Sequence, residues 1–231
     1  MMIADIGGYT RYMRLHRMSL AHSQEITSRL LKALVRAASP LKLIEIEGDA
    51  AFLSTSIRGD AMSTVGIVAD VAVSMHAAFH AEQDRMVALN MCSCPGCIEA
   101  GRLRVKFVAH VGEVARQTIR KREQLVGLDV IVVHRMLKNS VPIEEYVLMS
   151  EPVYRESAPL VRERVTDLED ELEGLGLTTL YFVDLQSLAP ARASVPTPTL
   201  ARRVRKTLGV VVRATPRMLR KQRQRAVADG F

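Results

Sequence analysis

Two aspartates near the start of the chain stand in glycine-containing stretches, and both could bind a metal ion. Asp5 follows a short apolar run in "IADIGGYT", and Asp49 lies in "EIEGDAAF". A carboxylate beside a glycine-rich turn can hold a hard cation while backbone N–H groups face phosphate oxygens. If the two stretches pair as strands, both carboxylates converge, and magnesium with a nucleotide's phosphates is the natural occupant. The alternative is that both aspartates only form turns.

A second group that could do chemistry is the stretch "CSCPGC", which contains Cys92, Cys94 and Cys97. We expect its Pro-Gly pair to make a turn that lets the three thiolates converge. Three close thiolates suit a structural zinc ion, which usually takes a fourth ligand. His76 and His80, one helical turn apart, are candidates for that ligand. The alternative is an inert or redox-sensitive loop, with both histidines on an ordinary helix surface.

Two further histidines, His110 and His134, could act as an acid or a base. Neither has an orienting carboxylate that the sequence identifies, so we expect each to be buried or to cap an element. The sequence contains no Gly-x-Ser-x-Gly elbow, no phosphate-loop lysine motif and no Rossmann glycine fingerprint. These absences argue against an α/β-hydrolase, a P-loop nucleotide hydrolase and a Rossmann-type dinucleotide-binding enzyme.

The elements that must position these residues alternate between helix and strand. Apolar residues at helical spacing predict a helix over 23–38 that stops before Pro40. Two short apolar runs joined by Glu47, Gly48 and Asp49 predict a β-hairpin. The remaining patterns predict helices over about 62–88 and 128–139, and strands over 102–111, 146–150 and 179–185.

Charge and proline content divide the chain into two parts. Residues 189–231 hold eleven Lys and Arg and one acidic residue, a net charge of +10, so the rest of the chain carries −3 of the total +7. Three prolines in "SLAPARASVPTPTLA" indicate a linker. We therefore predict a domain over 1–188 and a basic tail over 189–231. With no leader or membrane-spanning run in the sequence, a cytoplasmic protein is the default expectation.

The tail alternates basic clusters with apolar residues, a pattern compatible with two short amphipathic helices. Residues 200–225 would suit an anionic membrane surface, which predicts peripheral binding at the inner face of the membrane. Nucleic acid is a less favoured partner, because no aromatic side chain precedes Phe231 in the tail to stack on bases. The alternative is a disordered, solvated tail.

Four blocks together resemble the class III nucleotidyl cyclase catalytic domain over residues 1 to about 188. In chain order they are "IADIGGYT", "EIEGDAAF", "KFVAHVGEV" and "LVGLDVIVVHRMLKN". More narrowly, the sequence resembles a bacterial cyclase-like family of undetermined function with a similar cysteine cluster. The resemblance implies an α+β, ferredoxin-like nucleotide cyclase fold, in which helices pack on a mixed or antiparallel sheet.

The resemblance also implies roles for individual residues. Asp5 and Asp49 match the two metal-binding aspartates, which hold Mg²⁺ or Mn²⁺ with ATP or GTP. Arg135 matches the arginine that stabilises phosphate charge during ring closure. Glu45 and Gln124 occupy the base-selecting positions, where a glutamate suits guanine. The loop that receives the triphosphate matches Ile6, Gly7, Gly8, Tyr9 and Thr10.

Two departures from the cyclase pattern weaken the case for catalysis. Ile131 replaces the asparagine that positions the ribose, and a hydrocarbon side chain cannot hydrogen-bond a sugar. Glu173 aligns with the expected lysine, so an anion replaces a cation. Loss of one preorganised transition-state donor can cost ~10²–10³ in rate. We therefore expect binding of a magnesium nucleoside triphosphate with weak, altered or absent cyclase activity.

The resemblance further implies a second chain. In class III cyclases the metal aspartates of one protomer face the arginine of the other, so we expect a homodimer or a cyclase-like heteropartner. The alternative function is a pseudoenzyme: a regulatory dimer or protein-interaction module with a structural metal at the cysteine cluster.

Overall fold

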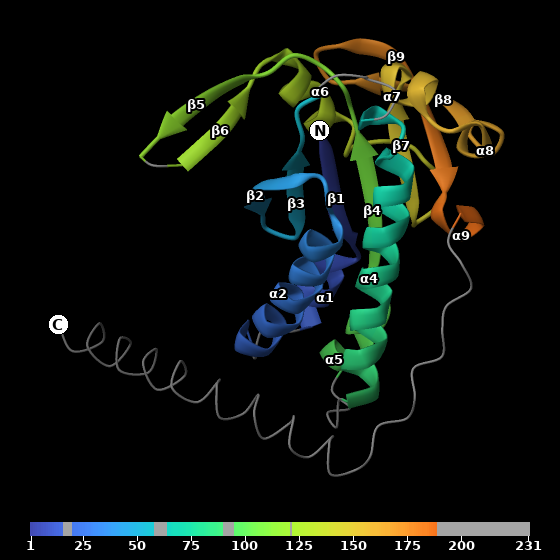
Figure 1. The fold of residues 1–231 in the computed structure, drawn as a ribbon. Helices are drawn as coiled ribbons and strands as arrows, with labels where there is room; N and C mark the ends of the chain where they lie inside the picture. The colour runs from blue at the N-terminus through green and yellow to red at the C-terminus, as the bar shows by residue number, and fades with distance from the viewer. Residues whose placement is uncertain (16–19, 58–63, 90–94, 121, 189–231) are drawn as a thin grey trace. The chain divides into compact units, whose positions relative to one another are not determined.

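The computed structural model describes residues 1–15, 20–57, 64–89, 95–120 and 122–188 (Figure 1). Its strands are β1 (Met2–Gly7), β2 (Lys42–Glu47), β3 (Ala50–Ser54), β4 (Arg104–Ala109), β5 (Ala115–Ile119), β6 (Arg122–Val126), β7 (Tyr146–Ser150), β8 (Thr166–Leu172) and β9 (Gly176–Asp184). Its helices are α1 (Tyr9–Leu15), α2 (Leu20–Ala37), α4 (Val68–Leu89), α5 (Pro95–Ala100), α6 (Leu128–Arg135), α7 (Glu151–Glu156), α8 (Pro159–Arg162) and α9 (Leu185–Leu188).

Seven of these strands form one mixed sheet in the order β2-β3-β1-β4-β7-β9-β8. All neighbouring strands run antiparallel except β4 and β7, which are parallel. Strands β5 and β6 form a separate two-stranded antiparallel ribbon, which extends away from the sheet in Figure 1. This mixed sheet with helices is the α+β architecture that the sequence predicts.

The core of the sheet forms because its central strands are apolar on both faces. Every residue of β3 and β7 is buried, as are Met2, Ile3 and Ala4 of β1. Val133 of helix α6, and Met136 directly after it, belong to the cluster that contains Ile3 and the sheet residues beside it. Burial of one such side chain contributes about 1.5–3 kcal/mol, so this packing fixes α6 on the sheet.

The predicted elements agree with the structure in type and differ at some ends. Strands β2 and β3 form the predicted hairpin, with Gly48 at φ +67° in its turn. The predicted helix over about 62–88 is interrupted: residues 64–65 are helical, 66–67 form a turn where Gly66 weakens the helix, and α4 begins at Val68. The Pro-Gly pair of the cysteine stretch begins helix α5 instead of making the predicted turn.

The chain forms two compact units, which we describe separately. The sheet unit comprises the described residues of 1–7, 31–79 and 104–188 and contains every strand. The helical unit comprises the described residues of 8–30 and 80–103. In this second unit α1 packs on α5, where Arg11 pairs with Glu99 at 2.9 Å.

Several sequence predictions concern residues outside the described part. The basic tail over 189–231, with its proposed membrane-binding segment, is one of them, and Cys92 and Cys94 are others. Within the described residues, no helix combines the length and hydrophobicity needed to cross a membrane.

Candidate functional site

The strand register brings Asp5 and Asp49 to one end of the sheet. Asp5 is paired with Ala50 of β3 on one side and with Lys106 of β4 on the other. Asp49 directly precedes Ala50 in the hairpin turn, so its carboxyl group lies in the electrostatic field of Asp5. The structure thus brings together the two carboxylates in the way their placement in the sequence predicts.

This carboxylate pair is destabilised by burial and by mutual repulsion. Burial, and then the charge of Asp5, raise the pKa of Asp49 from 3.8 to about 6. The backbone hydrogen bond of Asp49 and the charge of Lys106 oppose this rise. A bound divalent cation would relieve both costs, and carboxylate oxygens are the ligands that magnesium and manganese prefer. The chemistry of the pair therefore fits a hard metal ion.

Lys106 is a part of this site that sequence reasoning missed. Its ammonium Nζ lies 3.5 Å from Oδ2 of Asp5 and donates to the carbonyl of Leu137 at 3.2 Å. The nearby Tyr146 hydroxyl donates to Oδ1 of Asn139 at 2.8 Å, and burial raises the pKa of Tyr146. Only the pairing of β1 with β4 reveals that this lysine faces Asp5, about one hundred residues away in the chain.

The predicted phosphate loop is a tight connection from β1 into α1. Ile6 and Gly7 end the strand in the sheet unit, while Gly8, Tyr9 and Thr10 begin the helical unit. Gly8 has φ +82°, a conformation that favours glycine, and its carbonyl accepts from the N–H of Tyr12 at 3.0 Å. The glycine at this turn is therefore required by the backbone.

Helix α6 presents Arg135 at its last residue, and the arginine is paired within the chain. A guanidinium N–H of Arg135 donates to the carboxylate of Glu173, in the turn between β8 and β9. Glu173, which the resemblance aligns with the cyclase lysine, therefore lies beside Arg135. Ile131, which the resemblance aligns with the ribose-positioning asparagine of cyclases, is 50% exposed on the same helix.

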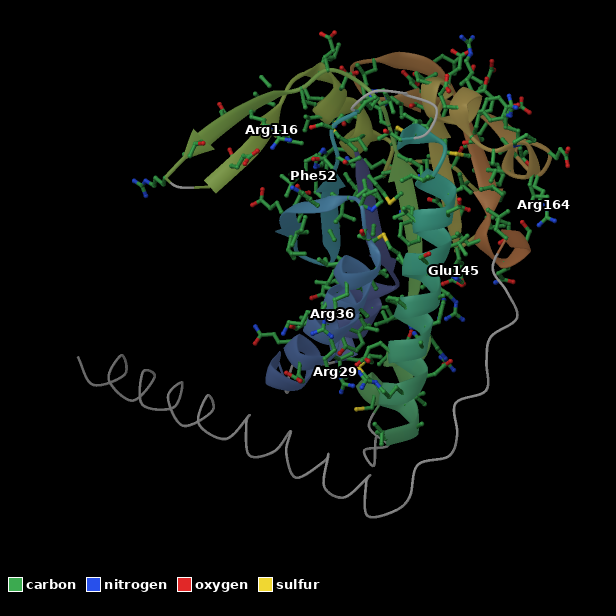
Figure 2. All side chains as sticks on the ribbon, in the orientation of Figure 1. Arg29, Arg36, Phe52, Arg116, Glu145 and Arg164 are labelled. Atoms are coloured by element: carbon green, nitrogen blue, oxygen red, sulfur yellow. The ribbon has the colours of Figure 1, made fainter. Side chains whose placement is uncertain are left out.

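Glu45 and Gln124, the two predicted base-selecting residues, line one open cavity of about 920 Å³. The cavity lies between β2, the segment after β3 and the β5–β6 ribbon. Arg116 of β5, labelled in Figure 2, also lines it and pairs with Glu123 of β6. The structure thus places Glu45 and Gln124 on one surface, although 78 residues separate them in the chain.

His110 is buried, as the sequence predicts, and both His110 and His134 have carboxylate partners that the sequence does not identify. His110 Nε2 lies 2.8 Å from Oδ1 of Asp129, and its Nδ1 lies 2.8 Å from Oγ of Ser150. His134 Nε2 lies 3.1 Å from Oε1 of Glu47. These contacts fasten both ends of α6 to the sheet, because Asp129 and His134 belong to that helix.

Both histidines of the predicted zinc site contact other side chains. Cys97 is buried in α5. In the sheet unit, Nε2 of His76 lies 3.3 Å from Oε2 of Glu145, which Figure 2 labels. In the helical unit, Nδ1 of His80 lies 2.9 Å from Oε1 of Gln83. The zinc hypothesis stays a prediction.

Comparison of the sequence with known proteins finds relatives without an assigned activity. The profile of the family described as "Protein of unknown function (DUF2652)" matches residues 27–146. The "Uncharacterized protein Rv2561/Rv2562" of Mycobacterium tuberculosis (strain ATCC 25618 / H37Rv) is 37% identical over 158 residues, which cover 68% of this chain and 73% of that protein.

Solved structures with the same fold are nucleotide cyclases. The adenylyl cyclase CyaB from P. aeruginosa has a TM-score of 0.59 at 13% identity, over 84% of this chain and 95% of that one. The guanylyl cyclase Cya2 has a TM-score of 0.57 at 14% identity, over 79% and 89%. A bacterial light-regulated adenylyl cyclase has a TM-score of 0.58 at 14% identity over 80% of this chain, which spans about half of that protein. The fold is therefore that of class III cyclase domains.

Proposed function

We propose that this chain, which belongs to the DUF2652 family of proteins of unknown function, binds a nucleoside triphosphate together with magnesium or manganese. The observation that carries the proposal is the convergence of Asp5 and Asp49 at one end of a sheet with the cyclase fold. The two carboxylates repel each other, and a divalent cation would turn that repulsion into coordination.

Asp5 and Asp49 would hold the metal ion, and Lys106 would change its partner from Asp5 to a phosphate when the ion binds. The ion would supply charge neutralisation to the phosphates of the nucleotide. Lys106 contacts Asp5 at 3.5 Å, so its ammonium can turn from the carboxylate to a phosphate oxygen when the ion binds. The backbone from Ile6 to Thr10 would receive the triphosphate, in keeping with the glycine-enforced turn at its centre.

The nucleobase would occupy the cavity that Glu45 and Gln124 line. A carboxylate accepts hydrogen bonds from the N–H groups of guanine, whereas glutamine can donate or accept and so suits either base. ATP and GTP are therefore both substrates to test, and Glu45 favours GTP.

Turnover to a cyclic nucleotide would be weak, altered or absent. Ile131 offers no hydrogen bond to a ribose, and Arg135 carries a carboxylate partner in place of an additional cation. Each lost transition-state donor costs ~10²–10³ in rate, while binding through the metal ion needs neither group. The chain would then act as a nucleotide-binding signalling domain.

A second chain would complete the site, as a homodimer or with a cyclase-like heteropartner. Exposed apolar side chains on β2, an edge strand of the sheet, are in keeping with such an interface. Leu43 and Ile46 of β2 are each 41% exposed, and Ile119 at the end of β5 is 52% exposed. The same residues favour the alternative function, a regulatory protein-interaction module without catalysis.

Two peripheral proposals concern the cysteine cluster and the tail. Zinc at Cys92, Cys94 and Cys97 would be detected by metal analysis of the purified protein, and no metal above background would remove the idea. Peripheral membrane binding through residues 200–225 would be detected by flotation with anionic liposomes. If the full chain and a chain ending at Leu188 stay equally in the soluble fraction at low salt, the tail is no anchor.

Titration calorimetry of the full chain with magnesium and each of the four triphosphates tests the proposal. We expect saturable, magnesium-dependent heat that Asp5→Ala abolishes. Asp167→Ala is the matched control, because Asp167 is an exposed acid on edge strand β8. Loss of heat with both variants, or with neither, contradicts the proposal. Mass spectrometry of incubations with ATP or GTP, with magnesium or manganese, then measures any cyclic product.

A further inference from the structure

The surface around Arg135 contains its own anion. The guanidinium of Arg135 donates to Oε2 of Glu173, and Nζ of Lys138 lies 4.0 Å from the same oxygen. Arg135 is the last residue of α6 and Lys138 follows three residues later, while the carboxylate comes from the β8–β9 turn, 38 residues after Arg135. One tethered carboxylate therefore balances part of a two-cation surface.

Glu173 is held at this place by the backbone around it. The turn is closed by a hydrogen bond from the N–H of Leu175 to the carbonyl of Leu172 at 2.8 Å. Gly174 and Gly176 have φ values of +79° and +81°, which only glycine adopts readily. Close by on β8, Asp170 accepts from the backbone N–H of Ser140 at 2.7 Å, which fastens the hairpin beside α6.

A carboxylate and a phosphate group bind a guanidinium through the same N–H donors. An anion that binds Arg135 must therefore displace Glu173 first. Because Glu173 is tethered, it competes at a high effective concentration, and a free anion with a single charge competes poorly. A polyphosphate carries several charges and can also bind Lys138. Its interactions with both cations therefore outweigh the interaction that is lost when Glu173 leaves Arg135.

We propose that Glu173 is a specificity-determining residue that occupies Arg135 as an internal anion and restricts this surface to polyphosphate groups. The inference rests on the proposed function, because it concerns the residue that would take the phosphates there. It extends that function by naming what a ligand must displace. Removing the charge of Glu173 frees both cations, whereas removing Arg135 leaves the carboxylate only Lys138 to neutralise.

Binding of inorganic tripolyphosphate without divalent cations, in EDTA at low salt, tests the inference on the full chain. We expect Glu173→Gln to bind tripolyphosphate about two- to five-fold more tightly than the unmodified protein, the range for loss of one exposed ion pair. Dimethyl phosphate, a monoanion, should bind the unmodified protein without measurable heat. The matched control is Glu171→Gln, an exposed acid on β8 two residues earlier, which should change affinity less.

A double-mutant cycle isolates the pair from the general charge of the surface. In an Arg135→Ala background, Glu173→Gln should give a smaller gain in affinity, because only Lys138 is then released. Equal gains from Glu173→Gln and Glu171→Gln, a gain that is undiminished without Arg135, or no binding to any variant would each overturn the inference. Failure of the proposed function would give a different result. Either no magnesium-dependent binding of a triphosphate would occur, or Asp5→Ala would not remove it. Unchanged melting temperatures confirm that the variants fold, since Glu173 lies in an exposed turn.

Discussion

Asp49→Asn should make the protein more stable at neutral pH in the absence of divalent cations. Burial and the charge of Asp5 raise the pKa of Asp49 from 3.8 to about 6, so the folded state binds a proton more tightly than the unfolded state does. The contribution of protonated Asp49 to the free energy of unfolding is then fully present below about pH 4 and is lost as the pH rises to about 6. Asparagine keeps a hydrogen-bonding oxygen and removes the charge that causes the loss.

The size of the effect follows from the shift in pKa. Two pKa units correspond to about 3 kcal/mol for a fully shielded group. Asp49 is only half-buried, and solvent screens its interaction with Asp5, so we expect about 1–2 kcal/mol. Above pH 6 the difference between the two proteins should stay constant, and below pH 4 it should disappear.

Urea unfolding between pH 4 and 8, in EDTA and then in magnesium, measures this prediction. Asp167→Asn, an exposed acid on β8, controls for the change in net charge. Magnesium should stabilise the unmodified protein above pH 6 and have little effect on Asp49→Asn, because a neutral amide is a poor ligand for this ion. An Asp49→Asn protein that is no more stable than the unmodified one at pH 7.5 would refute the reasoning about burial and repulsion.

Three other predictions probe the residues around the site. Gly112→Ala places a Cβ 2.0 Å from Cγ of Asp129, so it should cost about 1–3 kcal/mol in urea unfolding; an unchanged midpoint would show that Asp129 can move away freely. Lys106→Met leaves Asp5 without its cation, so the melting temperature at pH 8 should fall in EDTA and recover in magnesium; a fall that magnesium does not reverse would contradict this exchange. Leu148→Ala removes a fully buried side chain of β7 and should cost about 2–5 kcal/mol, whereas a loss below 1 kcal/mol would contradict its place in the core.

The elements that the sequence predicts correctly have a strong local signal. The β2–β3 hairpin combines apolar runs with the Gly48 turn, and β7 is a short apolar run that is buried throughout. Helix α6 is predicted to reach Asn139 but ends at Arg135, because the side-chain amide of Asn139 donates to the carbonyl of Met136 and so closes the helix end. That hydrogen bond has no signature in hydrophobic periodicity.

The elements and partners that the sequence does not predict depend on distant contacts. Strand β8 reads as a run of acidic residues, and it forms because β9 provides a paired edge. Every residue of β5 is exposed, so the ribbon has no apolar alternation to detect. The contacts of His110 with Asp129, and of Lys106 with Asp5, arise from strand order and helix packing, so no local pattern can predict them.

Both halves of the proposed site are charge-balanced by residues of the chain itself. Lys106 neutralises Asp5 where a metal ion would bind beside Asp49, and Glu173 neutralises Arg135 where a phosphate would bind. Binding of a metal nucleotide is therefore an exchange of ion pairs, in which the cation replaces an ammonium and the phosphate replaces a carboxylate. An exchange of this kind gains little from charge alone, because each new pair breaks an old one. Affinity must then come from charges that have no partner to lose. For the metal ion this charge is Asp49, and for Arg135 it is the additional phosphates of the ligand.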